Sequence, residues 1–277
     1  MKMIIQETLK KIQHFFQTQE ISTLKISTVV VGLGYTGVEL SDSLQESSLG
    51  VAYTLPKVIN NRECSKIHFP GKLTERSLSE LLNWAEKPPS LQRVIGIATM
   101  NAVSQYILKS HNPYKTINQN LVEYLQISPN SKIINIGLIK PLIRQLSQKT
   151  KNITIIEKDL PFGKNFKNFD TRRTIDELQE DELKCDILLS TGTALINDTL
   201  EPILKRFRSH AKFIAMIGPT ASMLPDILFN SGVNLVGGMT FLSTQETLKV
   251  IQEAGGTKFF KVYAHKYNFI NKERRYY

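Results

Sequence analysis

Residues 186–194, DILLSTGTA, carry the pattern that decides the fold, because a short apolar segment is followed at once by small residues. The same pattern recurs at 213–222 (FIAMIGPTAS) and at 234–238 (NLVGG). In an open α/β sheet, the loops that leave the carboxyl ends of parallel strands are where ligands bind. Small residues there let a ligand approach the backbone, and the following helix begins with free N–H groups. The pattern therefore predicts a ligand-binding edge of a parallel sheet.

The alternation of strands and helices extends upstream of this stretch. Residues 132–136 and 152–156 are short apolar segments with a helical pattern at 141–148 between them. Such alternation of apolar strands with helices is typical of a parallel sheet wrapped by helices. We therefore expect residues 111–277 to form a Rossmann-like α/β domain.

The first part of the chain has a different pattern. Ile5, Leu9 and Ile12 lie on one face of a helix predicted over residues 1–17. Strands predicted within 28–40 and 49–56 follow one another without a helix, so an antiparallel meander is expected. Helices are predicted over 75–86 and 92–109, on either side of two prolines that interrupt the helical pattern. Residues 1–110 are therefore expected to form an α+β domain. The expected fold class of the whole chain is α/β, with this α+β domain preceding the Rossmann-like domain.

The composition bounds the location and the partners. No apolar run approaches the roughly 20 residues that cross a bilayer, and the first residues turn polar too early for a signal peptide, so a cytoplasmic protein without a membrane partner is expected. The net charge is +10, and much of the excess lies in the basic tail expected over 257–277. No recognised nucleic-acid module accompanies that tail, so the sequence favours a small-molecule ligand over nucleic acid. Exposed sheet edges are compatible with a homodimer.

The metal-binding residue types are scattered. The two cysteines, Cys64 and Cys185, are far apart and form no CxxC pair. Cys64 and His68 have a spacing that would suit a helix, but a second pair of this kind is missing. If a transition metal is bound, we expect it inside an organic chelate that fills most of the coordination positions.

Several motifs resemble one known family. The runs at 189–200 (LSTGTALINDTL) and 217–225 (IGPTASMLP), with the N-terminal segments 34–40 (GYTGVEL), 49–53 (LGVAY) and 98–102 (ATMNA), resemble the family described as "putative heavy-metal chelation". The resemblance covers nearly the whole chain except the basic tail. It implies an N-terminal domain similar to that of enolase, a Rossmann-like domain after it, and a site in the cleft between them.

The expected site combines the strand-end loops with residues that the resemblance implies. Thr191 and Thr193 offer hydroxyls to an anion, although the same residues are also ordinary helix caps. The glycine-rich bend before Glu39 and the helix residue Asn101 enter by resemblance. The full set of expected ligand-binding residues is Tyr35, Thr36, Glu39, Asn101, Gly137, Glu157, Thr191, Gly192, Thr193, Asn197, Gly218, Pro219, Thr220 and Gly238.

Glu157 is the residue on which the alternatives divide. It ends the second strand of the α/β domain, about 20 residues after Gly137, where dinucleotide folds hold a ribose. The first turn has one glycine where the dinucleotide fingerprint needs three, so a standard NAD or FAD site is not expected. Glu157 is interpreted as a ribose acceptor, as a metal ligand, or as an ion-pair partner of Lys158 or Lys140.

Two functions from different classes follow from these residues. The first is binding of a small anionic ligand, such as a metal chelate or metallophore-like compound, in the interdomain cleft. The alternative is an enzyme that uses an adenosyl-containing cofactor or substrate at the same strand ends, as a transferase or in the synthesis of a small metabolite. A third interpretation assigns nucleic-acid binding to the basic tail. The sequence contains no GxSxG, Walker A or HExxH motif that would identify a reaction.

Overall fold

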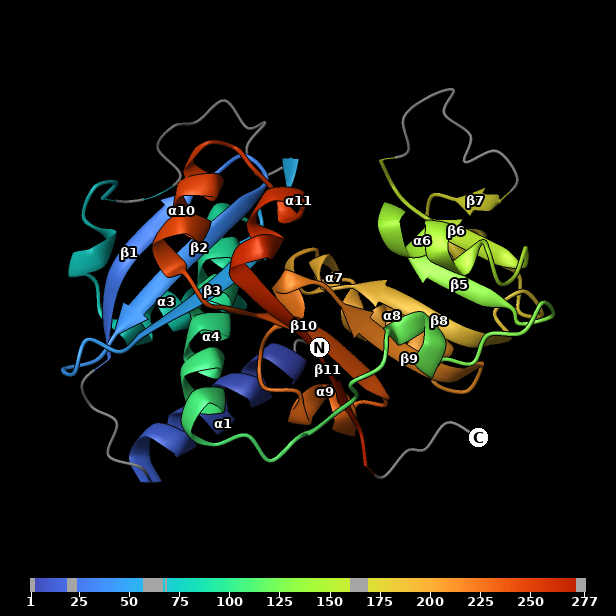
Figure 1. Ribbon diagram of the computed structural model, residues 1–277, viewed down its shortest axis with the longest axis horizontal. Coiled ribbons are helices and arrows are strands. Elements are labelled where there is room, and N and C mark those ends of the chain that lie inside the picture. The colour runs from blue at the N-terminus through green and yellow to red at the C-terminus, as the bar shows by residue number, and fades with distance from the viewer. Residues whose placement is uncertain (1–2, 19–23, 57–66, 68, 160–168, 273–277) are drawn as a thin grey trace.

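The structure is a computed structural model that describes residues 3–18, 24–56, 67, 69–159 and 169–272. Its first half contains one small antiparallel sheet and the helices around it (Figure 1). In chain order the elements are α1 (Met3–Thr18), β1 (Lys25–Val31), β2 (Tyr35–Ser41), β3 (Ser47–Tyr53), η1 (Leu73–Glu75), α3 (Leu78–Asn83), η2 (Trp84–Glu86) and α4 (Leu91–Ser110). The order β1-β2-β3, antiparallel throughout, confirms the predicted meander.

The second half of the chain forms an eight-stranded sheet with helices around it. Its first elements are β4 (Lys115–Thr116), α5 (Leu121–Tyr124), β5 (Ile133–Ile136), α6 (Lys140–Leu146), β6 (Ile153–Ile156), β7 (Asp170–Arg172), η3 (Ile175–Glu177) and β8 (Cys185–Thr191). The remaining elements are α7 (Thr193–Ile196), α8 (Leu200–Phe207), β9 (Ala211–Ile217), η4 (Pro219–Ala221), α9 (Asp226–Asn230), β10 (Leu235–Phe241), α10 (Thr244–Gln252), α11 (Thr257–Phe260), η5 (Lys261–Tyr263) and β11 (Ala264–Ile270).

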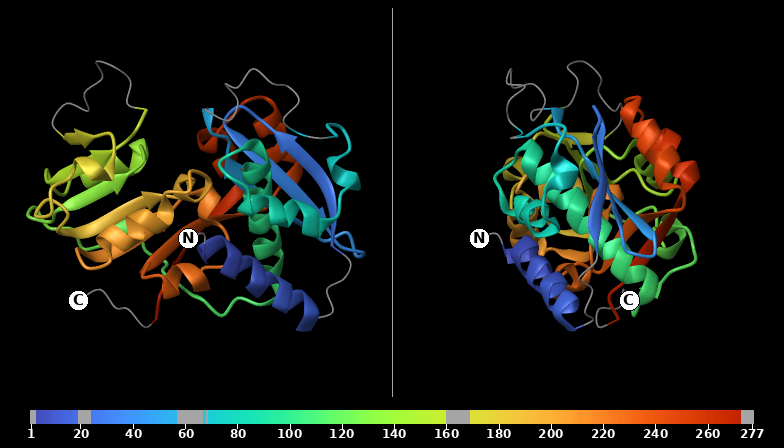
Figure 2. Two further views of the ribbon diagram at one scale, coloured as in Figure 1. Left: turned by 180° about the vertical axis from the view of Figure 1, so that it is seen from behind. Right: turned by 90° about the vertical axis from the view of Figure 1, so that its left-hand side faces the viewer.

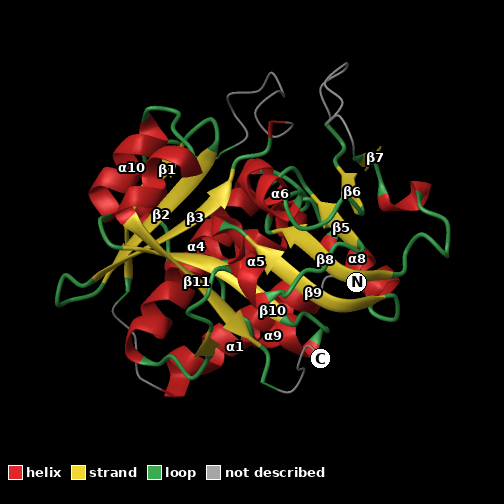
Figure 3. Ribbon diagram, turned by 45° about the vertical axis from the view of Figure 1, so that its right-hand side comes forward, coloured by secondary structure: helices red, strands yellow, loops and turns green. Residues whose placement is uncertain are grey.

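The strand order in this sheet is β4-β11-β10-β9-β8-β5-β6-β7. The strands from β10 to β7 are parallel, as the alternating pattern predicts. Strands β11 and β4 are antiparallel to their neighbours. Figure 3 shows the long yellow strands of this sheet side by side, with α6 beside β5. The α/β fold class is therefore confirmed, with an antiparallel edge added to the parallel sheet.

Elements from both halves of the chain enclose the small sheet. Helix α4 packs on one face, where Val38 and Leu40 of β2 are fully buried. The other face meets α10, since a Cβ on Gly37 would come within 2.7 Å of the Leu248 side chain. In Figure 1, α10 lies in front of the blue strands and α4 behind them, and the rear view in Figure 2 shows α1 below α4. The C-terminal part of the chain thus completes the N-terminal sheet.

Two expectations about the C-terminal part were wrong. Gly237 and Gly238 are not a loop after a strand, because β10 continues to Phe241 and pairs with β11 along its whole length. Residues 257–272 are not a tail, because they form α11, η5 and the sheet strand β11. The sequence also contains an irregular stretch over residues 159–173, which is interpreted as a lid or as a surface insertion, and most of it (160–168) lies outside the described residues. Within the described chain, no helix is long and apolar enough to cross a membrane.

Candidate functional site

The carboxyl ends of four neighbouring parallel strands lie at one edge of the large sheet. Ile136 of β5 is in register with Ile156 of β6 and with Ser190 of β8, and Thr191 of β8 is in register with Ile217 of β9. The residues that follow these strands therefore leave the sheet at one edge. We call this the strand-end edge, and its members are Gly137, Glu157, Thr191, Gly192, Thr193, Gly218, Pro219 and Thr220.

Close contacts link these loops across the edge. A Cβ on Gly137 would overlap the Thr191 side chain, and a Cβ on Gly192 would come within 3.0 Å of the Thr220 Cβ. Gly137 and Gly218 also have φ values of +89° and +123°, which residues with side chains rarely adopt. Gly137 is thus needed for both packing and backbone conformation, Gly192 for packing and Gly218 for backbone conformation. At this edge Gly137 and Gly218 are half-buried, whereas Gly192 is buried.

Glu157 holds the first loop of the strand-end edge. Its Oε2 accepts a hydrogen bond from the Leu138 N–H at 2.9 Å, and its Oε1 accepts one from the Asp159 N–H at 3.2 Å. The side chain is half-buried at the end of β6. Since each carboxylate oxygen has two acceptor positions, the group retains capacity for a ligand donor while it orients the β5–α6 turn. No ion pair with Lys140 or Lys158 is recorded for the described residues.

Tyr53, which the sequence analysis did not include, joins the small sheet to this edge. It is the last residue of β3, and its backbone N–H donates to the Thr220 Oγ1 at 3.0 Å. Burial raises the pKa of Tyr53, and the nearby carboxylates of Glu157 and Asp159 raise it further. The phenol therefore stays protonated at neutral pH, within the electrostatic influence of the two carboxylates that follow β6. The signal that could have identified Tyr53 as a site residue was an aromatic side chain at the half-exposed end of a meander strand.

Tyr35 and Thr36 support Tyr53 from within the small sheet. The Tyr35 hydroxyl shares a hydrogen bond of 2.7 Å with the Thr257 hydroxyl, and its ring meets the Tyr53 ring edge-on. Thr36 is fully buried and bonds to the Thr54 hydroxyl at 2.9 Å. The structure therefore places both residues behind the strand-end edge, where they act through packing.

Asn101 organises the loop after β9. It is fully buried in α4, and its Nδ2 donates to the carbonyls of Val51 at 3.0 Å, Thr220 at 3.1 Å and Pro219 at 3.4 Å. Its Oδ1 is buried without a recorded partner among the described residues. One side chain thus ties β3 to η4, which fixes the position of the loop that reaches Tyr53.

Residues 191–193 at the end of β8, which we call the threonine loop, offer hydroxyls to a ligand. A helix dipole adds little to the binding of an anion there. Thr191 and Thr193 are half-buried, and the Thr193 N–H is 3.4 Å from the Thr191 Oγ1. Helix α7 has four residues and η4 has three, so the expected contribution of long helix N-termini is small. Asn197 is exposed just after α7. Thr220 is buried and already bonded, which leaves the first two hydroxyls accessible.

Two predicted site residues lie elsewhere. Glu39 accepts a hydrogen bond from the Thr28 hydroxyl at 3.0 Å and lines a hollow with Ser41 and Ser243, on the α10 side of the small sheet. Gly238 is buried within β10, where a Cβ would overlap the Tyr267 ring. The structure does not bring either residue to the strand-end edge. Sequence pattern alone does not reveal which face of a meander strand turns to the other half of the chain.

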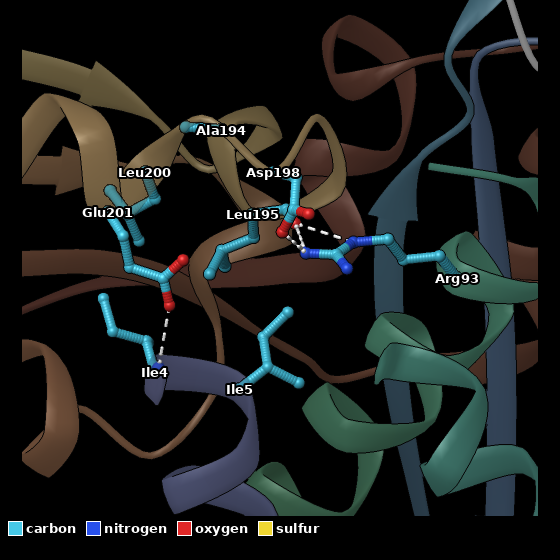
Figure 4. Close-up of a pocket in the computed structure, with 8 residues that line it drawn as sticks. All are labelled: Ile4, Ile5, Arg93, Ala194, Leu195, Asp198, Leu200 and Glu201. Atoms are coloured by element: carbon cyan, nitrogen blue, oxygen red, sulfur yellow. Dashed lines mark hydrogen bonds and ion pairs between the residues drawn. The ribbon is translucent and has the colours of Figure 1, made fainter. Parts of the chain in front are cut away.

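Arg93 is a second residue that the sequence analysis missed. Its guanidinium is 1% exposed, and it donates from Nε and Nη2 to the Leu195 carbonyl at 3.0 and 2.6 Å. It also donates to the Lys87 carbonyl and to the Asp198 carboxylate, each at 2.8 Å. Figure 4 shows Arg93 reaching from α4 to the loop that follows α7. The side chain anchors the back of the threonine loop, and no motif indicated this role.

The donor groups do not fit a bare soft metal ion. Among the described residues, no group of three or more His, Cys, Asp or Glu side chains is arranged to hold a metal. Burial raises the pKa of the Cys185 thiol to about 12, so this sulfur is not a thiolate ligand at neutral pH. Cys64 and His68 lie outside the described residues. The strand-end edge offers the Glu157 carboxylate and threonine hydroxyls, and Tyr53 of β3 adds a phenol.

Comparisons with known proteins agree with this architecture. A model of the DUF364 family, described as "putative heavy-metal chelation", matches residues 120–270, and a model of the DUF4213 family, with the same description, matches residues 17–104. An uncharacterised protein of Methanocaldococcus jannaschii is 27% identical over 272 residues, which are 96% of this chain and 97% of that protein.

Two solved structures from the same family are similar to this chain. A protein of unknown function from Pyrococcus horikoshii has a TM-score of 0.73 and 27% identity, over 97% of this chain and 100% of that one. A protein of unknown function from Desulfitobacterium hafniense has a TM-score of 0.69 and 16% identity, over 96% and 99%. Because a single family model covers more than half of the chain, the protein belongs to the DUF364 family, described as putative heavy-metal chelation.

Proposed function

We propose that the protein binds a small metal chelate between the strand-end edge and Tyr53. The observation that carries the proposal is the continuous series of contacts from Tyr53 through Thr220, Gly192 and Thr191 to Gly137. Glu157 holds the next turn, and its charge acts on the phenol of Tyr53, whose pKa it raises. These groups lie at one edge of the sheet, and the family description agrees with a metal-containing ligand.

The donor set favours a metal that arrives with its own ligands. One carboxylate and hydroxyl oxygens are too few to hold a soft metal ion against competing chelators. The hydroxyls suit the outside of a chelate, because those of Thr191, Thr193 and Tyr53 can donate hydrogen bonds to the oxygens of an anionic chelator. Lys140 and Lys158 are exposed and directly follow the loops of β5 and β6, where they add positive potential. The chelate is thus the ligand and the protein its receptor.

A second candidate is an enzyme with an adenosyl-containing ligand, and the position of Glu157 favours it. The carboxylate ends β6 and bonds to the turn after β5, whose Gly137 has a φ of +89°. Dinucleotide folds use an acidic residue in this place for the ribose hydroxyls. The Thr191 side chain occupies the space beside that glycine, which narrows the room for a pyrophosphate. Adenosine is therefore the nucleoside probe of choice.

Thermal unfolding with defined probes tests the two functions. The probes are zinc chloride, zinc iminodiacetate and adenosine, applied to the wild type, to Glu157→Gln and to the exposed control Glu123→Gln. Glu157→Gln keeps an acceptor for the Leu138 N–H, so the turn is retained while the charge is removed. A ligand at about 100 times its dissociation constant adds roughly 2.7 kcal/mol to the free energy of unfolding.

The expected result is stabilisation by zinc iminodiacetate, weakened in Glu157→Gln and unchanged in the control. Zinc chloride alone is expected to give a much smaller shift, because the donor set does not fit the bare ion. Stabilisation by adenosine alone, lost in Glu157→Gln, would replace the chelate by the nucleoside function. Stabilisation by none of the three probes would reject both.

A further inference from the structure

Four aromatic rings form a row that ends at the strand-end edge. Phe241 and Phe260 are buried, with ring centres 5.8 Å apart and planes inclined by 67°. Tyr35 follows at 5.0 Å and 84° from Phe260, and Tyr53 follows at 5.5 Å and 78° from Tyr35. Each ring meets its neighbour edge to face, which is a favoured geometry because ring edges and faces carry opposite partial charge.

The row holds Tyr53 in a fixed orientation. The backbone N–H of Tyr53 is bonded to Thr220, and the hydroxyl of Tyr35 is bonded to Thr257, so both ends of the Tyr35–Tyr53 pair are anchored. The first two rings of the row lie in the core, whereas Tyr53 is half-buried. Among the described residues, the recorded ring neighbour of Tyr53 is Tyr35 alone. The terminal ring is thus packed against Tyr35 and half-buried.

From this row we infer that Tyr53 is a platform for a planar aromatic ring, so that the ligand is a chelate of an aromatic chelator. The inference rests on the proposed function and specifies its ligand class. A fixed ring loses little conformational freedom when a second ring packs on it, which makes the contact effective. Glu157 and Asp159, whose charges act on Tyr53, would accept hydrogen bonds from donors at the edge of the ligand ring.

A matched pair of chelates tests the platform. Dipicolinate and iminodiacetate each offer one nitrogen and two carboxylates to zinc, and dipicolinate alone has an aromatic ring. Calorimetry with the zinc complex of each would be made on the full chain, as wild type, Tyr53→Phe and Tyr53→Leu. Tyr124→Leu is the control, because Tyr124 is a half-buried tyrosine of α5 that packs against Phe213, away from Tyr53. All variants keep the backbone N–H that bonds to Thr220.

The expected result is about fivefold tighter binding of zinc dipicolinate than of zinc iminodiacetate by the wild type, as one aromatic contact provides. Tyr53→Phe should keep this preference, and Tyr53→Leu should abolish it by weakening the binding of zinc dipicolinate more than that of zinc iminodiacetate. Equal binding of both chelates by the wild type, or an equal loss of both in Tyr53→Leu, would overturn the platform and leave the proposed function intact. Binding of neither chelate by the wild type would overturn both.

Discussion

Arg93 shows what one buried side chain does for the threonine loop. Its guanidinium satisfies the carbonyls of Leu195 and Lys87 and pairs with Asp198. Arg93→Met would leave both carbonyls without this donor in a buried place, so we expect the free energy of unfolding to fall by about 3 kcal/mol. Arg93→Lys should recover little of the lost free energy of unfolding, because an ammonium group cannot reproduce the planar arrangement of guanidinium N–H donors. Urea unfolding measures the change.

Arg144→Met is the matched control, because it removes the same guanidinium group from an exposed position on α6. Its effect should stay within about 0.5 kcal/mol. An equal loss in the two variants would show that Arg93 contributes through its bulk alone.

Asp186 gives a pH dependence with a defined sign. Its Oδ1 pairs with Lys212 at 2.7 Å and its Oδ2 accepts from the Lys132 N–H at 2.8 Å. The Lys212 hydrogen bond is the main cause that lowers the pKa of this carboxyl below its usual 3.8, and the Lys132 N–H adds to it. The carboxylate therefore stabilises the fold above its unfolded pKa, and this stabilisation is lost as the pH falls through the folded pKa.

The measurement compares wild type with Asp186→Asn by urea unfolding across this range. The wild type should be more stable at about pH 7, and the difference should shrink towards about pH 3. The exposed Asp181→Asn should show no such trend. A difference that stays constant with pH would contradict an ionic role for Asp186.

At the residue scale, the sequence located strand ends better than it located partners from outside the strands. Glu157, Thr191 and Gly218 were predicted because each follows an apolar strand, which is a local signal. Tyr53 and Arg93 come from elements far away in the chain, and their contacts depend on how α4 and β3 pack. The role of each predicted residue in ligand binding stays a prediction.

At the scale of elements, the contact between β3 and α4 depends on Gly50. A Cβ there would overlap the backbone of Ala98 and Ala102, with the Ala102 Cα at 2.8 Å. Helix backbone cannot move aside as a flexible side chain can, so Gly50→Ala should cost at least about 3 kcal/mol or prevent folding. Thermal unfolding followed by circular dichroism measures the loss.

Gly34→Ala is the control for this substitution, because the nearest atom to a Cβ there is the Gly255 carbonyl at 3.9 Å. Its melting temperature should stay close to that of the wild type. A wild-type melting temperature in Gly50→Ala would mean that α4 can shift away from the sheet.

Elements with a strong local period were predicted well, and those stabilised by distant pairing were not. Ile5, Leu9 and Ile12 predicted α1, and all three are buried on one face. The continuation of β10 through two glycines depends on pairing with β11, whose own sequence is basic and aromatic. Glycine and lysine argue against a strand locally, and the sheet overrides them.

At the scale of the whole molecule, the two sequence segments share one core. The largest hydrophobic cluster includes Leu40 and Val103 from the first segment and Leu188 and Met223 from the second. Polar contacts follow the same route, since Ser104 and Gln105 of α4 bond to the backbone of the η4 loop. The division of the chain into two domains at residue 110 stays a prediction. The shared packing indicates that the two segments depend on each other for folding.

We therefore predict that residues 1–110 and 111–277, expressed apart, do not fold independently. The first fragment would expose the sheet face that α10 covers, and the second would lose the α4 side chains that bond to the η4 loop. Each fragment should unfold without a cooperative transition, whereas mixing the two should restore one, because the missing contacts are then supplied between chains. Cooperative unfolding of fragment 111–277 alone would instead make it a self-sufficient domain. In that case the strand-end edge would form without Tyr53, and ligand binding by the fragment would measure what Tyr53 contributes.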